Sequence, residues 1–436
     1  MDRSLSPHLN RTRIRVPEAF AMLLTFLLVL SAGCVARAPG EPHGPASRTG
    51  FSQQGLDEIT HVLQAAVDRG ELGGIVTFVH RRGTLAQVDA VGFQDVAGTK
   101  PMARDTIFRI ASMTKPITSV AALILLEEGH FSLEDPVDRW LPELADPTVL
   151  PDPTAPLDTA IPASGPIRVI DLLTHRSGIV TPRNLPGPLR AALTQADANN
   201  AAGYDVWMKW IGEMPLANDP GTVFNYGNSL DVLGIFVERV AGMPLPQFLE
   251  ERIFEPLEMR DTAFLVPTEK KDRFAQLHSL GHVPASWIPS PDAVPGFPSG
   301  AGGLYSTGDD YLRFARMLLG RGALGDVRIL KEETIDAMTT NRLTPEQREG
   351  TPFGGDAPHW RGQGFGLGVA IKDDPRIKTR ELGIASVGSF AWPGVFGTWW
   401  SADPEEDMII VFLVPGGEAL ATRWAFQEAV YGAIAD

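Results

Sequence analysis

Strand-like segments occur near both ends of the chain, whereas the long middle section has the pattern of helices and loops. Near the start, residues 74–80 (GIVTFVH) and 84–92 (TLAQVDAVG) flank a short glycine-containing turn, which predicts a β-hairpin. An amphipathic helix is predicted before the hairpin, from Leu56 to Gly70, and a long apolar helix after it, over 116–129.

The last quarter of the chain supplies the remaining strands. Three predicted strands lie at 365–371 (FGLGVAI), 394–402 (GVFGTWWSA) and 407–414 (DMIIVFLV), followed by a closing helix over 419–435. Strands at both ends with helices between them indicate a layered α/β (α+β) domain interrupted by a mostly helical insertion. We predict one catalytic domain over 55–436, with its α/β part at about 55–115 and 295–436 and its helical part at about 116–294.

The N-terminus has the pattern of an export signal. Four arginines precede the apolar run Phe20–Leu30, which at eleven residues is too short to span a membrane comfortably. Ser31-Ala32-Gly33-Cys34 follows and resembles a bacterial lipoprotein cleavage box, although the usual leucine three places before the cysteine is displaced to Leu30. We predict a lipoprotein-type signal over 1–34, a flexible Pro/Gly/Ser-rich tether over 35–54, and export to the periplasm or cell envelope with a lipid anchor on Cys34. The alternative is a plain secretory signal with an incidental cysteine.

Charge and cysteine content exclude several classes of protein. The formal net charge is −15, and it becomes −17 from Cys34 onward because four Arg and two acidic residues lie before it. Without a Lys/Arg block to neutralise phosphates, we expect no nucleic-acid partner. Cys34 is the only cysteine, so neither an intramolecular disulfide nor a thiolate metal cluster can form.

The motif with the clearest chemistry is Ser112-Met113-Thr114-Lys115 at the start of the apolar helix. If Ser112 opens that helix, Lys115 lies one turn on and both side chains share a face. Serine is a weak nucleophile until a neighbour accepts its proton, and a lysine amine does this only where its surroundings keep it uncharged. One S-x-x-K is weak evidence by itself, because the pattern also arises by chance.

A second motif, Phe224-Asn225-Tyr226-Gly227-Asn228, offers a partner for that lysine. A tyrosine beside a lysine can share and carry a proton, as phenol with amine or as phenolate with ammonium. Asn228 could hold Lys115 or a substrate carbonyl through its amide. The alternative is a turn before the predicted helix 230–240, with Asn228 or Ser229 as its N-cap.

Several ordered motifs together resemble the serine β-lactamase and penicillin-binding-protein superfamily, particularly the class C β-lactamases and the family VIII carboxylesterases. The resemblance covers roughly 55–430. Its motifs are FRIASMTK (108–115), LEEG (126–129), DLLTHRSG (171–178), FNYGN (224–228) and SGAGGL (299–304). It implies a β-lactamase-like fold, with an antiparallel sheet from both chain ends flanked by helices and a mostly helical inserted domain. It also implies that Ser112 is the nucleophile, with Lys115 and Tyr226 as general base and acid.

The third motif of that superfamily is normally Lys-Thr-Gly on a strand at the edge of the active site, and here Trp392-Pro393-Gly394 stands in its place. A lysine would hold a substrate carboxylate, whereas tryptophan offers an apolar wall suited to an acyl or alcohol group. By resemblance, the backbone N–H groups of Ser112 and Val395 form the oxyanion hole.

Further residues are expected to bind the substrate. They are Asn228, Trp392, Gly394 and the aromatic side chains of Phe224, Phe390 and Phe396. Asp231 stands where relatives often have an aromatic residue, and this difference is expected to alter the pocket rim.

No metal or cofactor is expected. His278 and His282 share helical spacing but lack the Glu and third ligand of a metal site, and His175 is interpreted as bracing a loop.

We therefore predict a serine hydrolase that cleaves small carboxylic esters. The alternatives are β-lactamase or D,D-peptidase activity, with the same nucleophile, and a non-catalytic envelope binding protein on the same fold.

Overall fold

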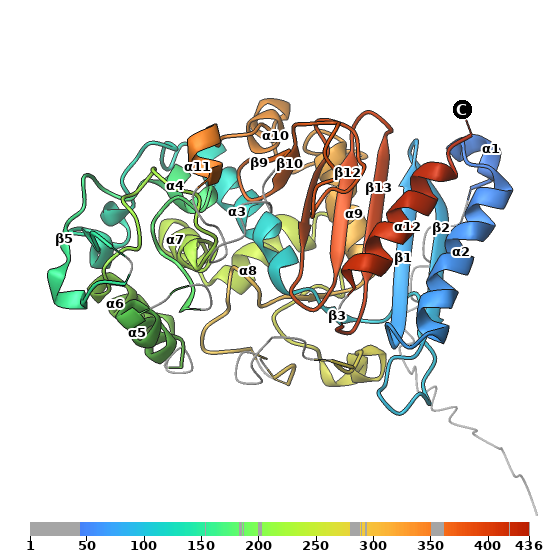
Figure 1. Cartoon of the computed structure of the whole chain (residues 1–436), viewed down its shortest axis with the longest axis horizontal. Helices are drawn as coiled ribbons and strands as arrows, with labels where there is room; N and C mark the ends of the chain where they lie inside the picture. The colour runs from blue at the N-terminus through green and yellow to red at the C-terminus, as the bar shows by residue number, and fades with distance from the viewer. Residues whose placement is uncertain are drawn as a thin grey trace, which may run out of the picture. The chain divides into compact units, whose positions relative to one another are not determined.

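The centre of the structure is a seven-stranded sheet built from both ends of the chain (Figure 1). The computed structural model describes residues 44–152, 154–182, 185, 187–198, 203–279, 288, 290–292, 294–349, 362–417 and 419–435. The strands are β1 (Gly74–Arg81), β2 (Thr84–Gly92), β9 (Gln363–Phe365), β10 (Ala370–Lys372), β11 (Phe390–Pro393), β12 (Trp399–Asp403) and β13 (Met408–Leu413). They lie in the order β2-β1-β13-β12-β11-β10-β9, and each neighbouring pair is antiparallel.

The two chain ends join where β1 pairs with β13, with Phe78 opposite Val411. Every residue of both strands is buried, because helices cover both faces of the sheet at this point. Strands that are buried on both faces have continuous apolar sequences rather than alternating apolar and polar residues. The predicted hairpin and the antiparallel sheet from both chain ends are confirmed.

Two predicted C-terminal strands were wrong in extent. Residues 365–371 form parts of two strands, β9 and β10, because the chain reverses between them. Gly368 has a φ of +91°, and a Cβ there would lie 2.0 Å from the Ser119 hydroxyl oxygen. Residues 394–398 form the turn between β11 and β12, so the strand predicted from 394 begins only at Trp399.

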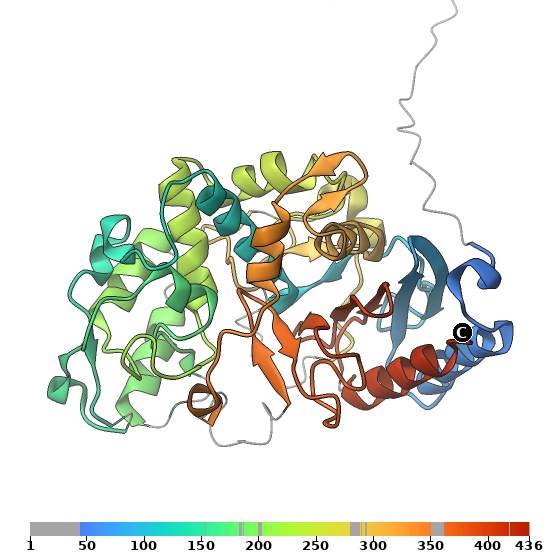
Figure 2. The same ribbon diagram turned by 90° about the horizontal axis from the view of Figure 1, so that it is seen from above.

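Helices form a layer on each face of the sheet (Figure 2). α2 (Gln53–Asp68) and α12 (Leu420–Gly432) pack against one another on one face, where Phe426 contacts Phe412 with ring centroids 5.6 Å apart. α9 (Gly308–Leu319) packs on β1, β12 and β13 from the other face. This three-layer arrangement buries the sheet, and β11, third from the β9 edge, contacts η1 at the start of the helical part of the chain.

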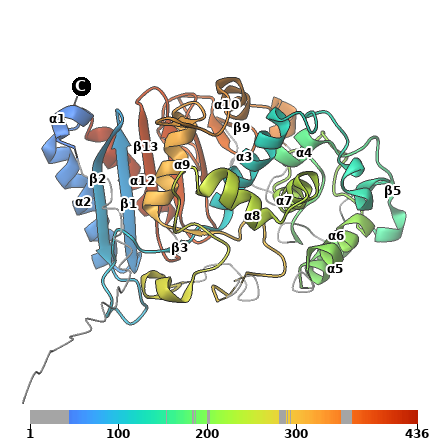
Figure 3. The same ribbon diagram turned by 180° about the vertical axis from the view of Figure 1, so that it is seen from behind.

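The inserted section is mostly helical, as predicted. Its helices are α3 (Thr114–Glu127), α4 (Val169–Leu173), α5 (Gly187–Ala198), α6 (Tyr204–Glu213), α7 (Ser229–Ala241) and α8 (Leu245–Leu249). α3 packs along α7, and α8 contacts both helices (Figure 3). α3 is the long apolar helix predicted over 116–129, and its residues 114–125 are all buried.

Short elements complete the described fold. They are α1 (Ala46–Thr49), α10 (Glu332–Met338), α11 (Pro345–Glu349), the 3-10 helices η1 (Ala111–Met113), η2 (Val137–Arg139), η3 (Pro142–Leu144), η4 (Leu157–Thr159) and η8 (Thr268–Arg273), the π-helical η7 (Glu250–Phe254), and the two-stranded pairs β3 (Phe108–Arg109) with β6 (Tyr305–Ser306), β4 (Thr148–Val149) with β5 (Ile161–Pro162) and β7 (Ala323–Leu324) with β8 (Val327–Arg328).

The N-terminal boundary differs from the prediction. The tether predicted over 35–54 overlaps α1 and the start of α2, so its second half is folded. Phe51 is buried, and the Ser52 hydroxyl accepts a hydrogen bond from Gly55 N (3.0 Å) as the N-cap of α2. Residues 1–43, with the predicted signal and Cys34, lie outside the described residues.

In the described part of the chain, no single helix is both long and apolar enough to cross a membrane. One bent pair, Ser229–Ala241 with Leu245–Phe254 at 81°, meets the requirement by length and composition alone.

Candidate active site

Ser112 lies in the middle of η1, a single 3-10 turn that leads directly into α3. The residue before it, Ala111, has a φ of +45°, a left-handed conformation that is uncommon outside glycine. The turn is held from below by Tyr311 on α9, whose hydroxyl donates to Met113 O (2.9 Å). Ser112 therefore sits on a tightly fixed bend at the head of a buried helix, and its own side chain stays partly exposed.

Lys115 projects from the first turn of α3 towards that serine. Its Nζ lies 3.1 Å from Ser112 Oγ and donates to the backbone carbonyl of Ala301 (2.7 Å). The lysine is only 3% exposed, so its amine is shielded from bulk water. The expected one-turn spacing has brought the hydroxyl and the amine together.

Tyr226 reaches the same point from the segment that precedes α7. Its hydroxyl donates to Ser112 Oγ (2.8 Å), and Lys115 Nζ lies 4.7 Å from the centroid of its ring. The structure thus places a hydroxyl, an amine and a phenol in mutual contact, although Tyr226 is more than a hundred residues from the other two in sequence. This arrangement can move a proton away from a serine oxygen.

The carboxylate of Asp231, expected to alter the pocket rim, lies behind Lys115 instead. Asp231, in the first turn of α7, accepts hydrogen bonds from the Ser299 hydroxyl (2.5 Å) and from Ala301 N (3.2 Å). Burial raises the pKa of Asp231, while the hydrogen bond from Ser299 opposes that rise. Asp231 therefore fixes the backbone whose carbonyl holds Lys115. The only signal in the sequence was its place five residues after Tyr226, near the start of the predicted helix 230–240.

The end of β11 forms another wall of the site. A Cβ at Gly394 would lie 2.5 Å from Ile110 O, so glycine is required where this strand passes the turn that carries Ser112. Thr398 donates to the same carbonyl (3.3 Å), and Phe396 packs against Ala111. Val395, between Gly394 and Phe396 in the sequence, is 46% exposed.

Two backbone N–H groups are available beside the serine. Neither Ser112 N nor Val395 N donates a backbone hydrogen bond to another described residue. Both belong to segments that meet at Ala111 and Phe396. They are therefore suitable donors for an oxygen that develops negative charge next to Ser112.

The aromatic side chains predicted to contact the substrate are mostly core residues, which corrects that prediction. Phe224 is 1% exposed and packs on Phe365 (5.0 Å), and Phe390 is 2% exposed and packs on Trp400 (5.8 Å). Trp392 is 3% exposed, so it is not an open wall either. Its ring lies against Tyr226 (5.4 Å) and supports the phenol.

The remaining predicted polar residues have different outcomes. Asn228 is buried as the N-cap of α7 but makes no capping hydrogen bond with its side chain, so its amide is not used to start the helix. The backbone N–H of His278 donates to Pro415 O (2.7 Å). His282 lies outside the described residues. Among the described residues, no three His, Cys, Asp or Glu side chains group as metal ligands would.

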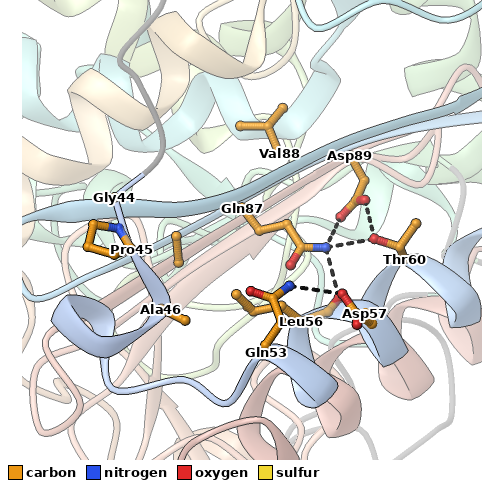
Figure 4. Close-up of a pocket in the computed structure, with 11 residues that line it drawn as sticks. Gly44, Pro45, Ala46, Gln53, Leu56, Asp57, Thr60, Gln87, Val88 and Asp89 are labelled. Carbon is orange, nitrogen blue, oxygen red and sulfur yellow. Dashed lines mark hydrogen bonds between the residues drawn. The ribbon is translucent and has the colours of Figure 1, made fainter.

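A pocket of about 390 Å³ lies elsewhere in the molecule, between α1, α2 and β2 (Figure 4). Gln87 donates there to Asp89 (2.7 Å) and Thr60 (2.8 Å), and both polar and apolar residues line the pocket. It opens beside β2, the edge strand at the opposite end of the sheet from β9, whereas Ser112 lies beside β11. We assign it no part in the chemistry at Ser112.

The sequence and the fold are similar to those of known proteins. The sequence model of the Beta-lactamase family matches residues 59–428. Protein Rv1367c of Mycobacterium tuberculosis (strain ATCC 25618 / H37Rv) is 42% identical over 363 residues, covering 82% of this chain and 90% of that protein. Esterase EstB of Burkholderia gladioli is 30% identical over 396 residues, covering 85% and 93%. The solved structure of EstCE1, described as a hydrolase with promiscuous acyltransferase activity, matches with a TM-score of 0.72 at 26% identity, covering 88% of this chain and 99% of that one.

Proposed function

The chain belongs to the beta-lactamase family of serine hydrolases, esterases and acyltransferases, and we propose that it cleaves small carboxylic esters through an acyl-enzyme on Ser112. The observation that carries the proposal is the contact of Ser112 Oγ with both Lys115 Nζ (3.1 Å) and the Tyr226 hydroxyl (2.8 Å). A serine held in this way has two groups at hand that can take and return its proton.

In the proposed acylation step, Ser112 Oγ attacks the carbonyl carbon of the ester as its proton passes to the amine of Lys115, the member of the Lys115–Tyr226 pair that can accept it. The N–H groups of Ser112 and Val395 stabilise the oxyanion of the tetrahedral intermediate. The pair then returns a proton through Tyr226 to the oxygen of the leaving alcohol. The bond from carbon to that oxygen breaks, and the acyl group remains on Ser112.

Deacylation uses the same groups in the same order. A water molecule takes the place of the alcohol, loses a proton to the Lys115–Tyr226 pair and attacks the acyl carbon. The ester bond to Ser112 breaks as the serine oxygen regains a proton, and the carboxylic acid is released. Because one pair serves both half-reactions, loss of either member slows both.

Trp392 favours esters over β-lactams in this proposal. It stands where the superfamily normally has the lysine of Lys-Thr-Gly, so that position offers no cation to a substrate carboxylate. Its buried ring supports Tyr226 instead. We therefore expect kcat/KM for a short-chain ester to exceed kcat/KM for a cephalosporin.

The test compares Ser112→Ala with Ser119→Ala on a chromogenic ester. Ser119 is a matched control because it lies on the same helix, is fully buried, and has no hydrogen-bond partner for its hydroxyl among the described residues. We expect Ser112→Ala to abolish turnover and Ser119→Ala to preserve it. Near-wild-type turnover by Ser112→Ala would refute the proposal, and a higher kcat/KM for the cephalosporin would refute the choice of esters.

Acyl transfer is a second candidate, because EstCE1 is described as a hydrolase with promiscuous acyltransferase activity. An alcohol that replaces water in the second half-reaction would yield a new ester from the same acyl-enzyme. Product analysis in the presence of added primary alcohols distinguishes the two outcomes. Release of acid alone at every alcohol concentration would exclude transfer.

For the N-terminal segment we propose export and lipidation at Cys34, supported by the basic start, the short apolar run and the small residues before the cysteine. Membrane fractionation of the full chain and of Cys34→Ser tests this proposal. We expect the native chain in the membrane fraction and the variant in the soluble exported fraction. A native chain found in the soluble exported fraction would contradict lipidation.

A further inference from the structure

His175 contacts the Tyr226 segment at three points. Asn225 N donates to the backbone carbonyl of His175 (2.7 Å), and Gly227 N donates to its Nδ1 (3.3 Å). The imidazole ring also lies against the Tyr226 ring, with centroids 4.6 Å apart. One residue therefore holds the chain immediately before and immediately after the phenol.

The backbone of His175 is itself held in an uncommon conformation. Its φ is +53°, in the left-handed region that non-glycine residues rarely adopt. The side chain is 0% exposed, and its ring also contacts Phe224 (5.7 Å) and Phe365 (5.6 Å). Such conformations persist where the surroundings fix them, and they are concentrated at functional sites.

The hydrogen bond from Gly227 determines the protonation of the ring. Because Gly227 N–H donates to Nδ1, Nδ1 carries no proton, and the single proton of a neutral imidazole lies on Nε2. Burial lowers the pKa of His175 well below its usual range. A neutral, buried imidazole of this kind can orient a neighbour, but it does not exchange protons with a substrate.

Other contacts limit Tyr226 from the remaining sides. A Cβ at Gly227 would lie 2.5 Å from Val180 Cα and 2.6 Å from Ile179 O, so this segment is packed tightly against the loop after α4. The Trp392 ring also contacts the Tyr226 ring. The phenol hydroxyl therefore has little freedom to leave Ser112 Oγ while His175 is in place.

We infer that His175 is a positioning residue for the reaction, whose neutral imidazole holds the Tyr226 segment so that the phenol stays within hydrogen-bond distance of Ser112 Oγ. The inference rests on the proposed function, because His175 acts on catalysis only through Tyr226. It predicts that His175 affects kcat more than KM, and that its effect requires the Tyr226 hydroxyl.

A double-mutant cycle tests the inference. His175→Asn and His175→Gly both tolerate the left-handed backbone, but only asparagine offers an oxygen that can accept from Gly227 N–H. Each substitution is made in the wild type and in Tyr226→Phe, and kcat and KM are measured on the same ester. In the wild type we expect His175→Gly to lower kcat about 10²-fold at nearly unchanged KM, and His175→Asn to recover most of that loss. In Tyr226→Phe we expect His175→Gly to cause little further loss.

The control is His80→Asn, which removes another buried imidazole, on β1. We expect it to lower the melting temperature and to leave kcat unchanged. Equal losses from His175→Gly in both backgrounds, or no loss in either, would overturn the positioning role. A Tyr226→Phe enzyme with wild-type activity would overturn the proposed function instead, so the two failures are distinguishable.

If His175→Gly does not fold, ¹⁵N NMR of histidine-labelled wild-type enzyme decides the question. At pH 7 we expect an unprotonated Nδ1 and a protonated Nε2 for His175. A proton on Nδ1, or a doubly protonated ring, would break the hydrogen bond from Gly227 and refute the inference.

Discussion

Replacing Tyr226 by phenylalanine removes one oxygen atom from the site and leaves the ring in place. That oxygen donates to Ser112 Oγ (2.8 Å), whereas the ring packs between His175 (4.6 Å) and Trp392 (5.4 Å). The free energy of unfolding should therefore fall by only about 1 kcal/mol, the usual net value of one hydrogen bond. The effect on rate should be much larger, because a positioned general acid or base contributes about 10²–10⁴-fold to kcat.

Comparing an alkyl ester with a p-nitrophenyl ester makes this prediction more specific, because their leaving groups differ in whether they need a proton. An alkyl alcohol leaves only when its oxygen is protonated, which is the step we assign to Tyr226, whereas p-nitrophenolate leaves without a proton. We expect Tyr226→Phe to lower kcat/KM for an alkyl ester by about 10³-fold or more, which is about 4 kcal/mol of transition-state stabilisation. The loss on the p-nitrophenyl ester of the same acid should be clearly smaller.

The matched control is Tyr431→Phe on α12. It also deletes a phenol oxygen, one that donates a hydrogen bond to Asp403 (2.6 Å). Steady-state kinetics on both esters and thermal unfolding are measured for both variants. Tyr431→Phe should lose stability but keep its rate. If Tyr226→Phe retained wild-type kcat/KM on the alkyl ester, or lost the same factor on both esters, the assignment of Tyr226 as general acid would be refuted.

Three further predictions concern other residues. Lys115→Met keeps the buried stem but removes the amine beside Ser112 Oγ, so the acylation burst in stopped-flow should slow by about 10²–10⁴-fold; an unchanged burst would exclude Lys115 as the base. Gly394→Ala places a Cβ 2.5 Å from Ile110 O and should cost about 1–3 kcal/mol in urea unfolding together with activity, whereas Gly432→Ala, with open space around it, should cost neither. Burial raises the pKa of Asp310 to about 7 from 3.8, so the unfolded chain releases this proton at lower pH than the folded protein, and stability should fall as pH rises from about 4 to 7. The difference is on the order of 4 kcal/mol; Asp310→Asn should remove this part of the pH dependence, and parallel pH profiles for the two proteins would contradict it.

The parts of the fold that followed from the sequence are those encoded locally. The hairpin over 74–92 and the apolar run in β13 are short-range patterns, and the structure confirms both. The spacing of Ser112 and Lys115 also follows from one turn of helix. The reversal between β9 and β10 was missed, because Gly366 and Gly368 within an apolar run resemble a strand with two weak positions.

The site was predictable in its reacting groups but not in what supports them. Tyr226 was found through a motif, whereas the role of Asp231 depends on contacts with Ser299 and Ala301, almost seventy residues away, that no local pattern encodes. The prediction that aromatic side chains line the pocket was wrong for a similar reason. Phenylalanine is a residue type that often lines apolar pockets, but the tertiary structure decides which side chains are buried. Phe224 and Phe390 both pack in the core.

The most direct test is to trap the covalent intermediate and locate it by mass spectrometry. The intact protein is mixed with a slowly hydrolysed ester or an alkyl phosphonate, quenched in acid and digested. We predict one added acyl or phosphonyl group per chain, on the peptide that contains Ser112, and no added group in Ser112→Ala. Steady ester turnover without any adduct, or an adduct on another residue that persists in Ser112→Ala, would contradict the proposed mechanism.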